Sequence, residues 1–229
     1  EVVVVGGVRR SALISLSNLD DFEMAKAKSG QWWESNGQRA LANNSAVYNS
    51  KPNTAQFLRE WRNLYESKSG ERGIYNIDSV RKHIDKFGRR DSSLVGGTNP
   101  CGEILLRPNE FCNLTEVVID AIDTKETLLE KVRLATILGT WQSTLTNFKY
   151  IRKTWKDNCE EERLLGVSLT GIYGNKITAT NGKALEALLD EMRHLSVSVN
   201  DKEAKSLNIN PSVSITCVKP SGTVSQLTG

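Results

Sequence analysis

Residues 163–172, "RLLGVSLTGI", form a largely apolar run in which, after Arg163, the aliphatic residues are interrupted only by glycine, serine and threonine. A short continuous run of this kind is typical of a strand that is buried on both faces, as in a parallel sheet. The pattern that begins at "NGKALEALLDEM" predicts a helix over residues 182–207, and "SVSITCVK" at 212–219 predicts another strand. This order of strand, helix and strand predicts an α/β fold with a parallel component.

The rest of the chain continues the alternation. Asp20 and Asp21 are candidate N-caps of a short helix that extends to about Lys28. Residues 29–53 are rich in Asn, Ser and Gly, and Trp32 and Trp33 within them are expected to pack against the body of the protein. The apolar periodicity predicts further helices at 54–67, 76–87 and 125–147, and further strands at 1–7, 11–16, 103–107 and 113–119.

Composition excludes several classes of protein. The chain has 229 residues, 38% of them hydrophobic and 25% charged, which is ordinary for a globular protein. A net charge of +3 is too small to argue for a nucleic-acid partner. No apolar run approaches the ~20 residues that a membrane helix needs, and no signal peptide is recognisable. The composition therefore favours a cytoplasmic protein without a membrane or nucleic-acid partner.

The chain contains four cysteines and two histidines. The cysteines lie at positions 101, 112, 159 and 217 and form no CxxC pair, so their spacing argues against a structural zinc site, and we expect no protein-bound metal. Cys159 precedes three glutamates, which disfavour its thiolate, so it is interpreted as incidental to function. Cys217 lies within a predicted strand and is interpreted as a core residue. Reduced thiols are the expected state.

The stretch "TNPCGEI" at residues 98–104 places a thiol between a proline and a glycine. If the stretch is extended, Asn99, Cys101 and Glu103 point to one face, with roughly 6–7 Å between neighbours. Pro100 fixes its own φ angle, and Gly102 tolerates backbone shapes that other residues cannot adopt. The pattern therefore predicts a stiff loop or strand tip that displays an amide, a thiol and a carboxylate. The alternative is a turn around a small buried cysteine.

Two turns are candidate phosphate sites. "KPSGTVS" at 219–225 follows a predicted strand and should open a helix, whose positive end would place backbone N–H groups and hydroxyls around an anion. It lacks the GK[ST] sequence of a Walker loop. "GGVRRSA" at 6–12 could hold a nucleotide phosphate or base, or could be a surface turn with two solvated arginines.

Several stretches, taken in order, resemble the catalytic subunit of ribonucleotide reductase. They are "GGVRRSA" (6–12), "RALANNSAVY" (39–48), "TNPCGEI" (98–104), "FCNLTEV" (111–117) and "KPSGTVSQLTG" (219–229). The spacing of "NPCGEI" and "FCNLTEV" is highly specific, whereas "PSGT" supports the resemblance only by its position. Within the family, the chain is most similar to the adenosylcobalamin-dependent (class II) ribonucleoside-triphosphate reductases.

The resemblance covers residues 1–229 and implies a fold. The family forms a ten-stranded α/β barrel, made of two five-stranded halves, with an internal finger loop that carries a radical cysteine. This chain would be the later portion of that barrel domain. Residue 1 is Glu, "EVVVVGG" begins inside a predicted buried strand, and "SQLTG" follows a loop that should open a helix. We therefore expect a fragment, truncated at both termini and inactive by itself.

The resemblance also implies a reaction, the radical-based reduction of ribonucleoside triphosphates to 2′-deoxyribonucleotides for DNA synthesis. Cys101 would be a transient thiyl radical that removes the 3′-hydrogen of the ribose. Glu103 would act as general base on the 3′-hydroxyl, and Asn99 would hydrogen-bond the sugar hydroxyls. Cys112 resembles one member of the family's reducing thiol pair, whose other member lies upstream of residue 1.

Ligands follow from the same resemblance. The expected cofactor is adenosylcobalamin, which carries its own cobalt, and the expected reductant is a thioredoxin-like dithiol. The substrate phosphates would bind to Pro220, Ser221, Gly222, Thr223, Val224 and Ser225. A deoxynucleotide effector would bind to the loop of Gly6, Gly7, Val8, Arg9, Arg10 and Ser11. Two alternatives remain open: a class I large subunit, whose radical comes from a separate metal-containing protein, and a nucleotide-binding module without chemistry.

Overall fold

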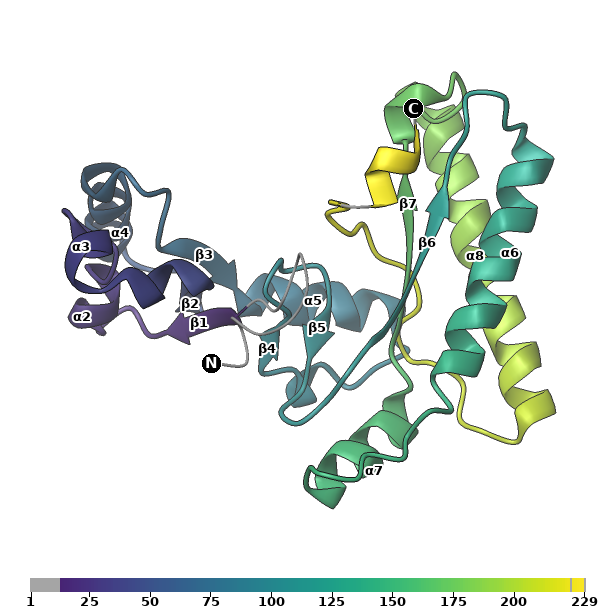
Figure 1. The fold of residues 1–229 in the computed structure, drawn as a ribbon, viewed down its shortest axis with the longest axis horizontal. Helices are drawn as coiled ribbons and strands as arrows, with labels where there is room; N and C mark the ends of the chain where they lie inside the picture. The colour runs from purple at the N-terminus through teal and green to yellow at the C-terminus, as the bar shows by residue number, and fades with distance from the viewer. Residues whose placement is uncertain (1–12, 223, 229) are drawn as a thin grey trace. The chain divides into compact units, whose positions relative to one another are not determined.

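The computed structural model describes residues 13–222 and 224–228. The predicted strand at 1–7, the predicted effector loop at 6–11 and Thr223 lie outside the described residues. The chain divides into two compact units, Glu1–Arg107 and Pro108–Gly229 (Figure 1). They are called the amino-terminal and carboxyl-terminal units below, and each is described by itself.

A three-stranded parallel sheet organises the amino-terminal unit. Its strands are β1 (Leu13–Ser17), β2 (Ala42–Tyr48) and β3 (Gly73–Asn76), with β2 in the middle. Parallel neighbours need crossover connections, and helices supply them here. The first crossover contains α2 (Phe22–Ala25), α3 (Trp32–Ser35) and the 3₁₀ helix η1 (Gly37–Leu41), and the second contains α4 (Thr54–Ser67).

Local capping explains where these helices begin. The side chain of Asp21 accepts a hydrogen bond from the backbone N–H of Met24, at 2.9 Å, which confirms the predicted start of α2. Asn53 and Gln56 form a capping box at the start of α4, in which each side chain bonds to the other's backbone. Helix α5 (Ile77–Phe87) follows β3 directly, and the side chain of Asn76 caps it.

The chain then forms the short 3₁₀ helix η2 (Ser92–Leu94) and an antiparallel hairpin of β4 (Gly97–Thr98) and β5 (Leu105–Leu106). Gly97 lies opposite Leu106, and Thr98 lies opposite Leu105. This hairpin contains the "TNPCGEI" stretch at its tip.

In the carboxyl-terminal unit, β6 (Asn113–Val118) and β7 (Leu165–Thr170) pair in parallel along their full length. Helices α6 (Lys125–Gln142) and α8 (Lys183–Leu207) lie side by side and cover one face of this pair (Figure 1). The core between them is apolar and consists of Val117, Ile119, Leu128, Val132, Ala135, Leu165, Val167, Leu188, Met192 and Ile215. Full burial of a Val, Leu, Ile or Met side chain contributes about 1.5–3 kcal/mol to the stability of the folded state. Helix α7 (Lys153–Glu162) lies between α6 and β7 in sequence.

A buried asparagine fixes the segment that follows α8. The Nδ2 of Asn200 donates to Thr140 Oγ1 at 2.9 Å and to Ser212 Oγ at 3.0 Å, and its Oδ1 accepts from the N–H of Ser212 at 2.8 Å. These bonds satisfy the amide of a side chain that is 0% exposed. They hold the start of the 212–217 segment against α6 and α8.

The main predictions of fold class are confirmed: the protein is mixed α/β with parallel strands, and the buried strand at 163–172 and the helix at 182–207 are both present. The strand predicted at 212–219 is wrong in extent, because the structure has only a β-bridge between Val167 and Thr216. The N–H groups of Leu165 and Val167 donate to the carbonyl oxygens of Ser214 and Ile215. The two donors are two residues apart in β7, whereas their acceptors are adjacent in the chain, so a regular ladder is interrupted here.

Three other expectations differ from the structure. The Asn-rich stretch at 29–53 contains the central strand β2, which its polar composition concealed. Trp33 is 56% exposed, because it lies on the outer side of a one-turn helix, whereas Trp32 is half-buried beneath Lys28. Helix α6 ends at Gln142, whereas the sequence predicted a helix that continues to residue 147.

No helix in residues 13–222 and 224–228 combines the length and the apolarity that crossing a membrane requires.

Candidate functional site

The cysteine of "TNPCGEI" lies in a tight turn. The N–H of Gly102 donates to the carbonyl oxygen of Asn99 at 3.0 Å, which closes a four-residue turn with Pro100 and Cys101 at its centre. Gly102 has a φ of +87°, a conformation that disfavours any residue with a side chain. The extended row of Asn99, Cys101 and Glu103 is therefore wrong, whereas the predicted position of Cys101 at the tip of a loop is confirmed. Cys101 is exposed, so the alternative of a buried cysteine is also wrong.

Asn99 stabilises the hairpin from within. Its Oδ1 accepts from the N–H of Ile104 at 3.0 Å and from Thr98 Oγ1 at 3.3 Å. Its backbone N–H also donates to the carbonyl of Ile104, at 3.1 Å. These bonds orient the Asn99 amide. They occupy its Oδ1 within the hairpin and do not involve its Nδ2.

Glu103 lies on the returning limb of the hairpin and is half-buried. Its Oε2 is buried and has no hydrogen-bond partner among the described residues. A buried carboxylate oxygen without a partner is costly, so such an atom is expected to meet a ligand or another polar group in the functioning protein.

Side chains from the neighbouring sheet and helix hold the base of the hairpin. Tyr75 Oη, at the end of β3, donates to the carbonyl of Gly97 at 3.0 Å, and Arg81 on α5 donates to the carbonyl of Val95 at 3.3 Å. Burial raises the pKa of Tyr75, although the positive charges of Arg81 and Arg90 act in the opposite direction. Tyr75 therefore keeps its hydroxyl proton at neutral pH and stays a donor.

Two further donors reach the limbs and the tip. Arg90 Nη1 donates to the carbonyl of Leu105, in β5, at 2.7 Å. Asn43 Nδ2, in β2, donates to the carbonyl of Pro100 at 2.7 Å. The sequence analysis singled out the stretch around Asn43 only because it resembles the reductase family, and it predicted no contact with the hairpin. No local pattern identifies Tyr75, Arg81 or Arg90 as partners of the hairpin.

Cys112 belongs to the carboxyl-terminal unit, where it is half-buried directly before β6. The preceding residue, Phe111, packs against Trp155 and Phe148, with ring centroids 4.6 and 5.2 Å away. The N–H of Phe111 donates to the Sγ of buried Cys159 at 3.3 Å. Cys159 is thus a buried hydrogen-bond acceptor beside Phe111, whereas Cys217, predicted to be a core residue, is only half-buried. The four cysteines form no disulfide within the described part of the chain.

The predicted phosphate loop lies in the same unit, towards the carboxyl ends of β6 and β7. The N–H of Lys219 donates to Ser168 Oγ at 2.9 Å, which fixes the entry to the loop. Pro220 and Gly222 are exposed, and the Oγ of Ser221 is buried without a partner among the described residues. The helix predicted after the loop is the 3₁₀ helix η4 (Val224–Thr228).

Local bonds shape the exit of this loop. Ser225 Oγ donates to the carbonyl of Gly222 at 2.9 Å, and Thr228 Oγ1 donates to the carbonyl of Ser225 at 2.7 Å. Gly171, just after β7, has a φ of +78°, and a Cβ there would lie 2.6 Å from the carbonyl oxygen of Ile119. Glycine at 171 therefore allows the turn after β7 to pass close to the end of β6.

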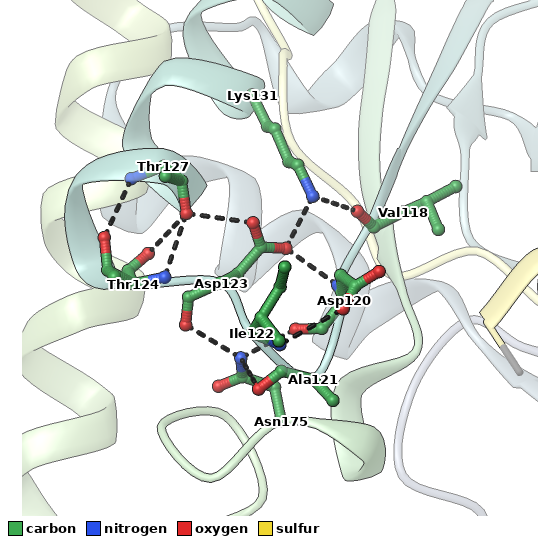
Figure 2. A network of polar contacts seen from close by, with 9 residues as sticks. All are labelled: Val118, Asp120, Ala121, Ile122, Asp123, Thr124, Thr127, Lys131 and Asn175. Atoms are coloured by element: carbon green, nitrogen blue, oxygen red, sulfur yellow. Dashed lines mark hydrogen bonds and ion pairs between the residues drawn. The ribbon is translucent and has the colours of Figure 1, made fainter.

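Figure 2 shows a polar network that joins the loops after β6 and β7. Asp123 Oδ2 accepts from the N–H of Asp120 at 2.7 Å and from Lys131 Nζ at 2.5 Å, and its Oδ1 accepts from Thr127 Oγ1 at 2.9 Å. Asn175 Nδ2 donates to the carbonyls of Asp120 and Asp123, at 2.8 and 3.0 Å. Every one of these contacts is intramolecular, so we interpret the network as a brace for the edge of the sheet beside the phosphate loop.

We expect Asp123→Asn to destabilise a protein that contains the chain by about 1–3 kcal/mol, the usual cost of removing a charged partner from buried hydrogen bonds. Burial acts to raise the pKa of Asp123, but the bonds from Lys131, Asp120 and Thr127 together hold this pKa below its usual value. A lowered pKa stabilises the folded state at pH values above the unfolded pKa of about 3.9, and this stabilisation is lost as the pH falls through the lower folded pKa.

Urea unfolding of the wild type and the Asn variant at a series of pH values measures this difference. It should be constant above about pH 5 and shrink below about pH 4. Asp190→Asn is the control, because Asp190 is an exposed partner of Arg193 and its loss should cost less than about 1 kcal/mol. An equal effect of the two substitutions would show that the network does not brace the loops.

Among the described residues, no group of three or more His, Cys, Asp and Glu side chains is placed to hold a metal ion.

No protein-family model matches the chain. It is 30% identical over 257 aligned residues to the adenosylcobalamin-dependent ribonucleoside-triphosphate reductase of Lacticaseibacillus paracasei, a match that covers 100% of this chain and 33% of that protein. It is 29% identical over 262 residues to the enzyme of the same name from Lactobacillus leichmannii, with 100% and 34% covered. A crystal structure of a B-12-dependent (class II) ribonucleotide reductase superposes with a TM-score of 0.70 at 25% identity, over 93% of this chain and 33% of that one. Along its whole length, the chain is homologous to class II ribonucleotide reductases.

The homology confirms the resemblance drawn from the sequence motifs. The chain spans about a third of the length of the curated class II reductases that it matches. The alpha subunit of the Actinobacillus ureae class Id ribonucleotide reductase also superposes, with a TM-score of 0.64 over 93% of this chain and 46% of that one. Its identity is 12%, so it supports the shared fold alone.

Proposed function

We propose that the chain supplies the radical-cysteine hairpin and the substrate-phosphate loop of an adenosylcobalamin-dependent ribonucleoside-triphosphate reductase. The observation that carries this proposal is the β4–β5 hairpin: Cys101 is exposed at its tip, the turn around it is braced, and Glu103 follows with a buried, unpartnered carboxylate oxygen. In this proposal, residues 1–229 are part of a ten-stranded barrel domain, and the hairpin is its finger loop.

The thiol fits the proposed cofactor. Cys101 is accessible at the tip of the hairpin, as a group that must exchange a hydrogen atom with another molecule has to be. When bound, adenosylcobalamin would supply the unpaired electron. A stiff turn suits a thiyl radical, because a mobile one would react with solvent or with neighbouring groups.

The remaining chemistry is assigned to side chains of this chain. The Cys101 thiyl takes the 3′-hydrogen of the ribose and becomes a thiol, and Glu103 takes the proton of the 3′-hydroxyl. The 2′-hydroxyl then leaves as water, with a proton from one thiol of the pair formed by Cys112 and a second cysteine. This pair supplies two electrons and the hydrogen that the 2′-carbon gains, and becomes a disulfide. Glu103 returns its proton to the 3′-oxygen, and Cys101 returns the hydrogen atom to the 3′-carbon. Asn99 orients the sugar through its hydroxyl groups.

Binding is assigned to two loops. Residues 220–225 would hold the triphosphate. The support for this is the exposure of Pro220 and Gly222 at the carboxyl ends of parallel strands, together with the Ser221 hydroxyl, which has no partner among the described residues. Residues 6–11 would hold a deoxynucleotide effector, on the support of the sequence resemblance. A thioredoxin-like dithiol would reduce the disulfide after each turnover.

The test is a turnover assay of the complete protein that contains this chain. Adenosylcobalamin, a ribonucleoside triphosphate and a dithiol should together yield the corresponding deoxynucleotide, and mixing should change the absorption spectrum of the cobalamin. Turnover that instead requires a separate metal-containing protein and ignores adenosylcobalamin would establish the class I alternative. Nucleotide binding without turnover under every condition would establish a module without chemistry.

A further inference from the structure

We propose that Asn43 is a positioning residue for Cys101, and that its hydrogen bond to the Pro100 carbonyl sets the direction in which the thiol points. The inference rests on the proposed function, since it assigns a role in the reaction to a residue outside the hairpin. It comes from the Asn43–Pro100 contact of 2.7 Å, which joins β2 to the turn.

The two consecutive asparagines of β2, Asn43 and Asn44, point to opposite faces of the sheet. Successive side chains of a strand point to opposite faces. Asn44 is buried, and its Nδ2 donates to the carbonyl of Met24, at the end of α2, at 2.8 Å. Asn43 is exposed and donates to the hairpin turn. The pair therefore ties the central strand to a helix on one side and to the cysteine turn on the other.

The accepting carbonyl belongs to the peptide group that joins Pro100 to Cys101. A peptide group is planar, so a bond that fixes its carbonyl also fixes the N–Cα bond direction of the next residue. Pro100 adds a fixed φ on the other side of the same peptide. The remaining freedom of Cys101 lies in its own backbone and χ1 angles, which the Gly102–Asn99 hydrogen bond further restricts.

Strand β2 is a suitable anchor because it is held on both edges. It pairs in parallel with β1 from Ala42 to Ala46 and with β3 from Ser45 to Tyr48. Tyr75, Arg81 and Arg90 bond to the base and limbs of the hairpin, whereas Asn43 reaches the turn itself. Loss of Asn43 should therefore loosen the tip and leave the limbs in place.

The experiment uses the complete protein with Asn43→Ala and the matched control Asn44→Ala. The first readout is the rate at which iodoacetamide alkylates each cysteine, resolved by mass spectrometry. Asn43→Ala should raise the alkylation rate at Cys101 by about 2- to 10-fold. This is the change in an equilibrium constant that the loss of one neutral hydrogen bond produces. The rate at buried Cys159 reports general opening and should not change. Asn44→Ala should lower the thermal stability and leave the rate at Cys101 unchanged, because the bond that it removes does not reach the turn.

The second readout is kinetic. Asn43→Ala should lower kcat about 10- to 100-fold, because misplacement of a reacting group by about 1 Å has effects of this size. KM should change less than about twofold, because the substrate phosphates bind elsewhere. Asn43→Asp should resemble the Ala variant when ionised, since a carboxylate cannot donate. As the pH falls through the pKa of the new carboxyl, its kcat relative to the wild type at the same pH should recover, because the protonated group can donate again.

Two outcomes overturn the proposal. One is an Asn43→Ala protein whose Cys101 alkylation and kcat both match the wild type. The other is equal acceleration at Cys101 and Cys159 without recovery of the Asp variant at low pH, which would show a general structural role. The alkylation measurement needs no turnover, so it decides the role of Asn43 even if Cys101→Ser shows that the proposed function is wrong.

Discussion

Replacement of Cys101 by serine should abolish deoxynucleotide production by the complete protein. Serine keeps the size and the exposed position of the side chain at the hairpin tip, but an oxygen-centred radical is not accessible to it under conditions that oxidise a thiol. Nucleotide affinity should stay within a few-fold of the wild type, because the turn closes through backbone atoms of Asn99 and Gly102 and does not need sulfur. Equilibrium binding and a turnover assay on the same preparation measure the two effects separately.

Cys159→Ser is the matched control for this substitution. Cys159 is buried, and its Sγ accepts a hydrogen bond from the N–H of Phe111, a role that a serine oxygen can also fill. Turnover of this variant should remain close to that of the wild type. Normal turnover by the Cys101 variant would refute the assignment of the radical to the hairpin.

Glu103→Gln and Cys112→Ser should fail at different steps. Loss of the general base should slow the chemical step by roughly 10²–10⁴-fold, the usual contribution of a positioned base. Cys112→Ser should allow the first hydrogen transfer from the ribose but block normal reduction, because one of the two electron-donating thiols is missing. A ribonucleotide labelled at the 3′ position, with single-turnover analysis of label release and of product, separates these steps.

Glu34→Gln provides a control for the loss of charge at residue 103, because Glu34 is an exposed glutamate on α3 in the same unit as Glu103. It should leave the chemical step unchanged. If the Glu103 and Cys112 variants instead stop at the same step, the division of roles between the two residues is wrong.

Local patterns were sufficient for much of the fold. The buried strand at 163–172, the helix at 182–207, the cap at Asp21 and the helix start at Thr54 follow from short-range rules. A helix N-terminus and a buried strand depend on neighbours within a few residues. The same rules failed for β2, because "ANNSAVY" is a strand by virtue of two parallel neighbours that lie far from it in sequence. They also failed for Trp33, whose exposure depends on what packs around α3.

For the candidate site, the sequence by itself identified the candidate residues, through the resemblance that the order and spacing of "NPCGEI" and "FCNLTEV" carry, and it predicted a stiff tip from Pro100 and Gly102. Only the tertiary structure decided that the tip is a closed turn with an exposed thiol, and that Asn43, 57 positions earlier in the chain, holds it. The physical reason is the range of the interactions. A φ preference belongs to a single residue, whereas a hydrogen bond from β2 to the Pro100 carbonyl exists only after the parallel sheet has brought the two segments together.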